Sequence, residues 1–204
     1  MMKFEKKLYS IVLAVAMLFA LVLPASAKSD DETANIYIAI VDGYDKAVSE
    51  AEFFTIKEQI KNGTLDKEAF IESALKNRSS IEVSYFPVEI VAASPVPRAT
   101  TYSLTKNTIK AKTTTKYTAT SGTGFYIKDD GSILMEATFA TTPKNSTVSG
   151  QIFPDGKVLA TKAIPSKKIR VGIAISGTGE YSVNVTNGDS ANLVMNSGSI
   201  TVST

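Results

Sequence analysis

The sequence predicts an α+β protein in which a small helical hairpin precedes an all-β antiparallel sandwich. Three observations lead to this prediction. Apolar residues recur at three- and four-residue spacing in the first half of the chain, whereas they alternate with polar residues in the second half. A short segment with two prolines separates the two patterns. We therefore divide the chain into a signal peptide (1–27), a mainly helical region (28–91), a linker (92–99) and a sandwich-like domain (100–204).

The first 27 residues show the order of features of a cleavable signal peptide. Lys3, Lys6 and Lys7 form a positive segment, residues 11–23 are apolar and uncharged, and residues 25–27 are small. The apolar run is shorter than the roughly 20 residues that a membrane-spanning helix needs. The sequence therefore predicts export, cleavage after residue 27, and a mature chain without an integral membrane segment.

The first predicted helix rests on apolar residues that share one helix face: Tyr44, Ala47, Val48, Ala51 and Phe54. Asn62-Gly63 ends this helix, because glycine accepts the left-handed conformation found at helix ends. Thr64 then caps a second helix that carries Asp66 and Glu68 in its first turn, where the helix dipole favours negative charge. The two helices form the predicted hairpin.

Three neighbouring segments complete the first half. Residues 36–41 are a continuous apolar run, which fits either a buried strand or an extension of the first helix. Residues 81–85 alternate between apolar and polar and predict a strand. Residues 92–99 hold the two prolines among small residues, which is typical of a stiff, extended linker.

The second half consists of short alternating segments between turn residues. Residues 169–176 and 181–186 alternate on either side of Gly177-Thr178-Gly179, which predicts a β-hairpin with one buried face. Asp130-Gly131 predicts a turn before a strand over residues 133–139. Further turn signals are Pro154-Asp155-Gly156, Asn187-Gly188-Asp189 and Ser197-Gly198. This spacing of about eight to ten strands favours a sandwich or barrel.

Residues 179–187, GEYSVNVTN, resemble the Gly-x-Tyr-x-Val-x-Val strand that closes many secreted bacterial β-sandwich modules, including the pre-peptidase C-terminal type. The turn-and-strand pattern over about Gly124–Thr204 is similar to such a module. The resemblance implies an accessory β-sandwich module, a group in which some members bind calcium or polymers. It does not extend to the helical half. The chain shows no matching cluster of acidic ligands, so neither activity is carried over.

Charge is divided unevenly between the two halves. Residues 28–98 hold 8 basic and 13 acidic residues, a net charge of −5, and residues 99–204 hold 11 basic and 6 acidic residues, a net charge of +5. The basic half could face the acidic half or an anionic partner. Nucleic acid is not expected as a partner, because the mature chain is neutral overall and exported.

Missing residue types exclude much chemistry. The chain has no histidine and no cysteine, which excludes Ser-His-Asp triads, thiolate nucleophiles and metal sites built on these residues. The absence of cysteine from an exported chain also favours a bacterial origin. The glycine-rich segments 121–124 and 177–179 lack the Gly-Lys-Ser/Thr of a P-loop. No catalytic residue, metal site or cofactor is therefore predicted.

Carboxylates are the remaining candidates for hydrolysis in the β half: Asp129, Asp130, Glu136, Asp155, Glu180 and Asp189. Two of them at a suitable separation could act on a glycosidic bond, but nothing in the sequence places two together. The acidic turns at residues 129–130 and 187–189 offer only a fraction of the oxygen ligands that calcium takes. We interpret them as hairpin turns.

The candidate binding segment is residues 106–116, which carry Lys106, Lys110, Lys112 and Lys116. On a strand, Lys110 and Lys112 would share a face. One interpretation is that these lysines contact an anionic surface, either cell-wall polymer or lipid headgroups. The other is that they keep a sheet edge soluble, as lysines on edge strands do.

Together these observations favour a secreted, extracellular bacterial protein that is not an enzyme and that binds a surface or another envelope protein. The alternative is a secreted effector, similar to a toxin or bacteriocin, whose amphipathic strands act on a target membrane. A carboxylate-dependent hydrolase is the third hypothesis.

Overall fold

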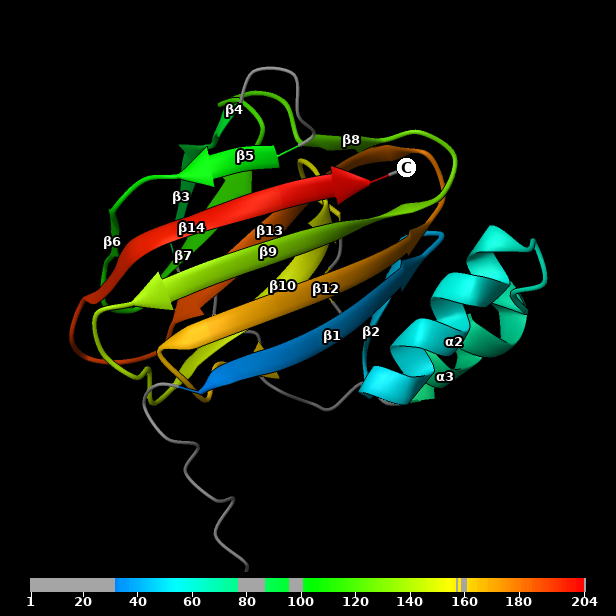
Figure 1. Ribbon diagram of the computed structural model, residues 1–204, viewed down its shortest axis with the longest axis horizontal. Helices are drawn as coiled ribbons and strands as arrows, with labels where there is room; N and C mark the ends of the chain where they lie inside the picture. Colours follow the sequence, from blue (N-terminus) through cyan, green and yellow to red (C-terminus); the bar gives the residue numbers. More distant parts are fainter. Residues whose placement is uncertain (1–31, 77–86, 96–100, 157, 159–160, 204) are drawn as a thin grey trace, which may run out of the picture.

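The structure is a computed structural model that describes residues 32–76, 87–95, 101–156, 158 and 161–203. Two β-sheets enclose a hydrophobic core, and two short helices lie beside one of them (Figure 1). The predicted signal peptide, the predicted strand at 81–85 and residues 96–99 of the predicted linker lie outside the described residues. In the part of the chain that is described, no helix is long and apolar enough to cross a membrane.

Sheet A has eight strands. In spatial order they are β2 (Tyr44–Val48), β1 (Thr33–Val41), β12 (Lys168–Ser176), β9 (Gly131–Phe139), β14 (Leu193–Ser203), β5 (Thr101–Leu104) and β4 (Ser94–Pro95), with β6 (Asn107–Ile109) also paired to β14. The predicted turn at Ser197-Gly198 is wrong, because both residues lie within β14 beside a bulge between Met195 and Ser197.

Sheet B has six strands. They are β11 (Lys162–Ala163), β10 (Ser146–Ile152), β13 (Gly179–Asn187), β7 (Thr113–Thr118) and β3 (Val88–Ala92), with β8 (Phe125–Ile127) also paired to β13. The pairs β1–β12 and β3–β7 are parallel, and the other pairs between described strands are antiparallel. The predicted sandwich-like, mostly β fold is therefore confirmed, although it is not purely antiparallel.

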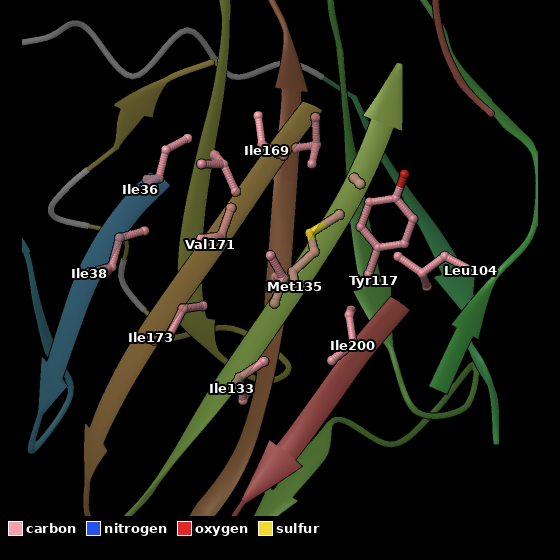
Figure 2. Close-up of a cluster of buried hydrophobic side chains, with 14 of the residues drawn as sticks. Ile36, Ile38, Leu104, Tyr117, Ile133, Met135, Ile169, Val171, Ile173 and Ile200 are labelled. Carbon is pink, nitrogen blue, oxygen red and sulfur yellow. The ribbon is translucent and has the colours of Figure 1, made fainter. Parts of the chain in front are cut away.

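The core lies between the sheets because successive side chains on a strand point to opposite faces. The predicted alternation in β9 and β12 is confirmed by the buried residues Ile133, Met135, Ala137, Phe139, Ile169, Val171, Ile173 and Ile175. Figure 2 shows several of these side chains beside Tyr117 of sheet B, Leu104 and Ile200. Each fully buried side chain of this size stabilises the fold by about 1.5–3 kcal/mol.

The N-terminal region contributes strands to both sheets. Residues 36–41 belong to β1, so the strand alternative is correct for this run. β1 lies between β2 and β12 and pairs with β12 from Thr33–Lys168 to Val41–Ser176. The predicted order of helices followed by strands is therefore confirmed only in part. The domain boundary at 92–99 stays a prediction.

The helical hairpin consists of α2 (Glu50–Lys61) and α3 (Lys67–Lys76). The predicted start of the first helix is wrong, because Tyr44, Ala47 and Val48 lie in β2. Ser49 caps α2: its Oγ accepts a hydrogen bond from the Glu52 backbone N at 3.3 Å, and Glu52 Oε2 accepts one from the Ser49 backbone N at 3.4 Å. This capping box has a Ser-x-x-Glu spacing that is visible in the sequence.

The predicted cap of the second helix is also wrong. α3 begins at Lys67, and Asp66 Oδ1 accepts a hydrogen bond from the Ala69 backbone N at 2.9 Å. Asp66 therefore caps the helix in place of Thr64. Its carboxylate also supplies the negative charge that a helix N-terminus favours.

The predicted hairpin over residues 169–186 is a crossover between the sheets. β12 pairs with β1 and β9 in sheet A, whereas β13 pairs with β10, β7 and β8 in sheet B. The apolar faces of β12 and β13 therefore meet across the core. In a hairpin they would lie side by side on one sheet. Alternation along each strand is the same in both arrangements, so the sequence pattern could not separate them.

Candidate functional site

The lysine segment is divided by a turn. Asn107–Ile109 and Thr113–Thr118 form β6 and β7, and residues 110–112 connect sheet A to sheet B. Lys112 has a φ of +55°, which is not a strand conformation. The expectation that Lys110 and Lys112 share one strand face is therefore wrong. Both side chains are exposed at the turn: Lys110 forms an ion pair with Glu89, and Lys112 Nζ donates to the Gly188 carbonyl.

Lys116 lies apart from the other three lysines. It sits in the middle of β7, only 9 % exposed, and its Nζ donates a hydrogen bond to the Pro154 carbonyl at 2.6 Å. The Phe153 ring lies 5.8 Å from the same nitrogen. Burial lowers the pKa of Lys116, while the negative charge of Asp155 opposes that shift. In this position Lys116 holds the turn after β10 against sheet B.

Three predicted lysines join three others at one end of the sandwich. We call this the lysine end, and it consists of Lys106, Lys110, Lys112, Lys144, Lys167 and Lys168. Here β1, β7, β12 and β14 begin, and β5, β9 and β13 end. In Figure 1 it is the left-hand end of sheet A, where the arrowhead of β9 lies. Sequence reasoning missed Lys144, Lys167 and Lys168, because no local pattern connects them to residues 106–116.

Asn187 fixes the strand connections at the lysine end. Its buried Nδ2 donates to the carbonyls of Ile109, Lys110 and Ala191 at 3.1, 3.2 and 2.9 Å. The Asn192 side chain accepts a further bond from the Ala111 backbone N at 3.0 Å. Because these bonds join the β6–β7 turn to the β13–β14 connection, the exposed lysines stand on loops that the fold positions.

Asp189 fixes a third connection, between β9 and β10. Its carboxylate accepts bonds from the backbone N of Lys144 and of Asn145, both at 3.2 Å, and from Asn145 Nδ2 at 2.8 Å. Partial burial by itself raises the pKa of Asp189. These hydrogen bonds and the charge of Lys112 outweigh that effect and lower the pKa below its usual value. Asp189 therefore stays ionised at neutral pH and holds the Lys144 loop in place.

The lysine end carries net positive charge. Among the described residues, its six lysines are accompanied by Glu32, Glu89 and Asp189. The turns at the opposite end carry Asp42, Asp129 and Asp130 together with Lys128. If positive and negative side chains alternated along the sheets, their electrostatic potentials would cancel. Because they gather at opposite ends, each end keeps an electrostatic potential of its own. The lysine end therefore presents an excess of positive charge to solvent.

Three of the candidate carboxylates of the β half have structural partners. Asp130 Oδ1 accepts a bond from the Gly177 backbone N at 2.7 Å, and Glu180 Oε2 accepts one from the Gly124 backbone N at 2.9 Å. Glu136 pairs with Arg170. Within the described residues, no group of three or more acidic side chains could hold a metal ion. These contacts supply no paired acid and base for hydrolysis.

Comparisons with known proteins give a likeness of fold only. No family model matches the chain, and no curated protein matches it. Two solved structures that match are PliG of Aeromonas hydrophila, a periplasmic inhibitor of g-type lysozyme, and the pre-peptidase C-terminal domain of a Bacillus anthracis collagenase. PliG has a TM-score of 0.38 and 12 % identity, over 57 % of this chain and 97 % of its own.

For the pre-peptidase C-terminal domain the TM-score is 0.35 and the identity 9 %, over 57 % of this chain and 95 % of that domain. The weak resemblance to such modules that the sequence indicated is therefore found among solved structures as well. Values of this size transfer no activity, so what PliG inhibits is not assigned to this chain.

Proposed function

We propose that this chain is a secreted, non-catalytic sandwich protein that attaches to an anionic polymer of the bacterial cell surface through its lysine end. The observation that carries the proposal is the gathering of six lysines from three separate parts of the sequence onto one end of the fold. Four of them, Lys106, Lys110, Lys112 and Lys144, are exposed.

The strength of such attachment depends on how many lysines contact the polymer at the same time. One exposed ion pair contributes about 0.2–1 kcal/mol, so a single lysine would hold a polymer poorly. Several lysines on fixed loops act on successive charges of the same polymer, so translational and rotational entropy is lost once and not again for each further contact. Salt weakens all of these contacts together, because exposed charges are screened over about 8 Å at physiological ionic strength.

The hypothesis of a membrane-acting effector rested on amphipathic strands. In the structure these strands bury their apolar faces between the sheets, as Ile173 of β12 and Val183 of β13 show. No apolar strand face of β9, β12 or β13 is left to enter a membrane. A membrane-acting effector would have to expose these buried faces, whereas attachment through the lysine end requires no change in the fold.

The test is co-sedimentation with isolated bacterial cell wall at low and high salt. A variant with Lys106, Lys110, Lys112 and Lys144 all changed to Gln should bind about tenfold more weakly at low salt, the result of losing roughly 1.4 kcal/mol or more. The matched control changes Lys57, Lys61, Lys76 and Lys128 to Gln, which alters net charge equally but leaves the lysine end intact. The control should bind like the unmodified protein.

Equal sedimentation of the two variants would contradict the proposal. β6 has no strand on its other side within the described residues, so Lys106 and Lys110 could instead keep that edge soluble. In that case the lysine-end variant would bind normally and scatter more light on concentration. β7, in contrast, lies between β13 and β3, so Lys116 is not on an edge.

A further inference from the structure

The outer face of sheet A carries a depression of about 350 Å³ beside the lysine end. β1, β12, β9 and β14 form its floor and sides. The helices do not cover it: α2 and α3 pack on the same sheet near Ala39 and Ala174, toward the other end of β1 and β12 (Figure 1). Four hydroxyl side chains line the depression: Thr33, Thr138, Ser197 and Ser199.

This depression contains an ion pair, Arg170–Glu136, that can form further hydrogen bonds. Arg170 Nε and Nη2 both donate to the same oxygen of Glu136, Oε1, at 2.8 and 2.6 Å. Within the described residues, Arg170 Nη1 and Glu136 Oε2 have no hydrogen-bond partner. About half of each side chain is exposed. The pair therefore offers a ligand a charged donor and a charged acceptor side by side.

The lining favours an anionic, hydroxyl-bearing ligand. Lys168 and Arg170 against Glu136 give it one net positive charge. Among the described residues that line it, none is aromatic, so the apolar face of a sugar ring would find nothing to stack on. Tyr37, on the same face, packs its ring 4.8 Å from that of Phe53 and donates its hydroxyl to Glu50. Recognition here must come from charge and hydrogen bonds.

We propose that this depression binds one unit of a polyol phosphate chain. The phosphate lies against Arg170 Nη1 and the charge of Lys168, and the polyol hydroxyls donate to Glu136 Oε2 and bond with Ser199 and Thr138. This inference rests on the proposed function, because it names the polymer that the lysine end would hold. Lys168 belongs to both sites, so a chain bound at the lysine end continues into the depression.

The experiment compares two polyanions of equal charge, poly(glycerol phosphate) and polyglutamate, by titration calorimetry on the full mature chain. The unmodified protein should prefer poly(glycerol phosphate) about tenfold, as expected for one or two charge-assisted hydrogen bonds in an exposed site. Arg170→Gln should remove this preference, whereas polyglutamate binding should weaken only by the small effect of one lost positive charge. Glu136→Gln, which keeps the shape but weakens the acceptor, should reduce the preference. The lysine-end variant should weaken binding of both polymers.

Equal affinity of the unmodified protein for both polymers would overturn the polyol phosphate inference and leave the proposed function standing. A retained preference in Arg170→Gln would overturn the assignment to this depression. Failure to bind either polymer, or cell wall, would overturn the proposed function as well. Unfolding curves for both variants verify folding, because exposed substitutions usually change stability by about 0.5 kcal/mol or less.

Discussion

At the scale of single residues, Lys116 is the clearest case in which the environment changes what a side chain does. The pattern of residues 106–116 places it with exposed lysines, yet Lys116 is only 9 % exposed and its Nζ donates to the Pro154 carbonyl. Gln151 Nε2 donates to the Gly156 carbonyl of the same turn, and Asn184 Nδ2 donates to Gln151 Oε1 at 2.8 Å. Lys116 thus belongs to a polar network that holds a loop onto sheet B.

The lowered pKa of Lys116 predicts a pH dependence of stability. As pH rises, the folded chain releases this proton before the unfolded chain does, because burial disfavours the charged form. Between the lowered pKa and the ordinary value of 10.5, the unfolded chain binds more protons, so the free energy of unfolding gains a contribution that increases with pH. Lys116→Met should lose this contribution, as measured by urea unfolding at pH 7 and pH 10.

The exposed Lys61 provides the matched control. Lys61→Met should show the same change in unfolding free energy between the two pH values as the unmodified protein. If Lys116→Met also showed that same change, the buried lysine would not be the source of the effect.

At the scale of elements, the close packing of the helical hairpin on sheet A depends on a glycine. A Cβ on Gly172 of β12 would lie 2.9 Å from Phe53 Cζ and 3.2 Å from Tyr37 Cδ1. Phe53 is a buried residue of α2, so its ring has little room to move. The sequence shows Gly172 as one of the small residues in an alternating strand; only the packing shows that α2 needs it.

Gly172→Ala should therefore destabilise the protein by about 1–3 kcal/mol, the usual cost of overpacking. Urea unfolding measures this loss. Gly122→Ala is the control, because no atom lies within 4 Å of its added Cβ, and it should be close to neutral. In a Phe53→Leu background the penalty at Gly172 should shrink. A penalty that stays the same in both backgrounds would rule out the contact with Phe53 as its cause.

At the scale of the whole molecule, β1 makes the N-terminal region part of the sandwich. It places Ile36, Ile38 and Ile40 in the core between the sheets and covers one edge of β12. The proline-containing segment at residues 92–99, which the sequence suggests as a linker, contains the last residue of β3 in sheet B and all of β4 in sheet A. Both sheets therefore contain strands from both sides of the predicted boundary.

We expect a fragment of residues 101–204 not to fold alone. The three isoleucines of β1 contribute about 1.5–3 kcal/mol each, which is a large part of the about 5–15 kcal/mol that stabilises a typical domain. The uncovered edge of β12 would also promote association between copies. Size-exclusion chromatography should show aggregates, and co-expression of residues 28–91 should restore soluble material. A monomeric fragment with a cooperative unfolding transition would support the predicted boundary instead.

The sequence by itself determined the features that depend on neighbouring residues. It excluded histidine and cysteine chemistry, assigned Ile133 and Ile173 to buried strand faces, and located turns such as Asp130-Gly131. Those features follow from composition, from the two-residue period of a strand and from local turn preferences.

Only the tertiary structure decided which strands pair, and therefore which side chains meet. β12 and β13 have the same alternation whether they form a hairpin or lie in opposite sheets, and β1 pairs with the distant β12 as well as with the adjacent β2. Lys144 and Lys168 lie with Lys110 at one end of the sandwich, because strand order and direction bring distant connections together. Lys116 lies away from that end, in the middle of β7. Local periodicity sets the face of each side chain, whereas long-range packing sets its neighbours.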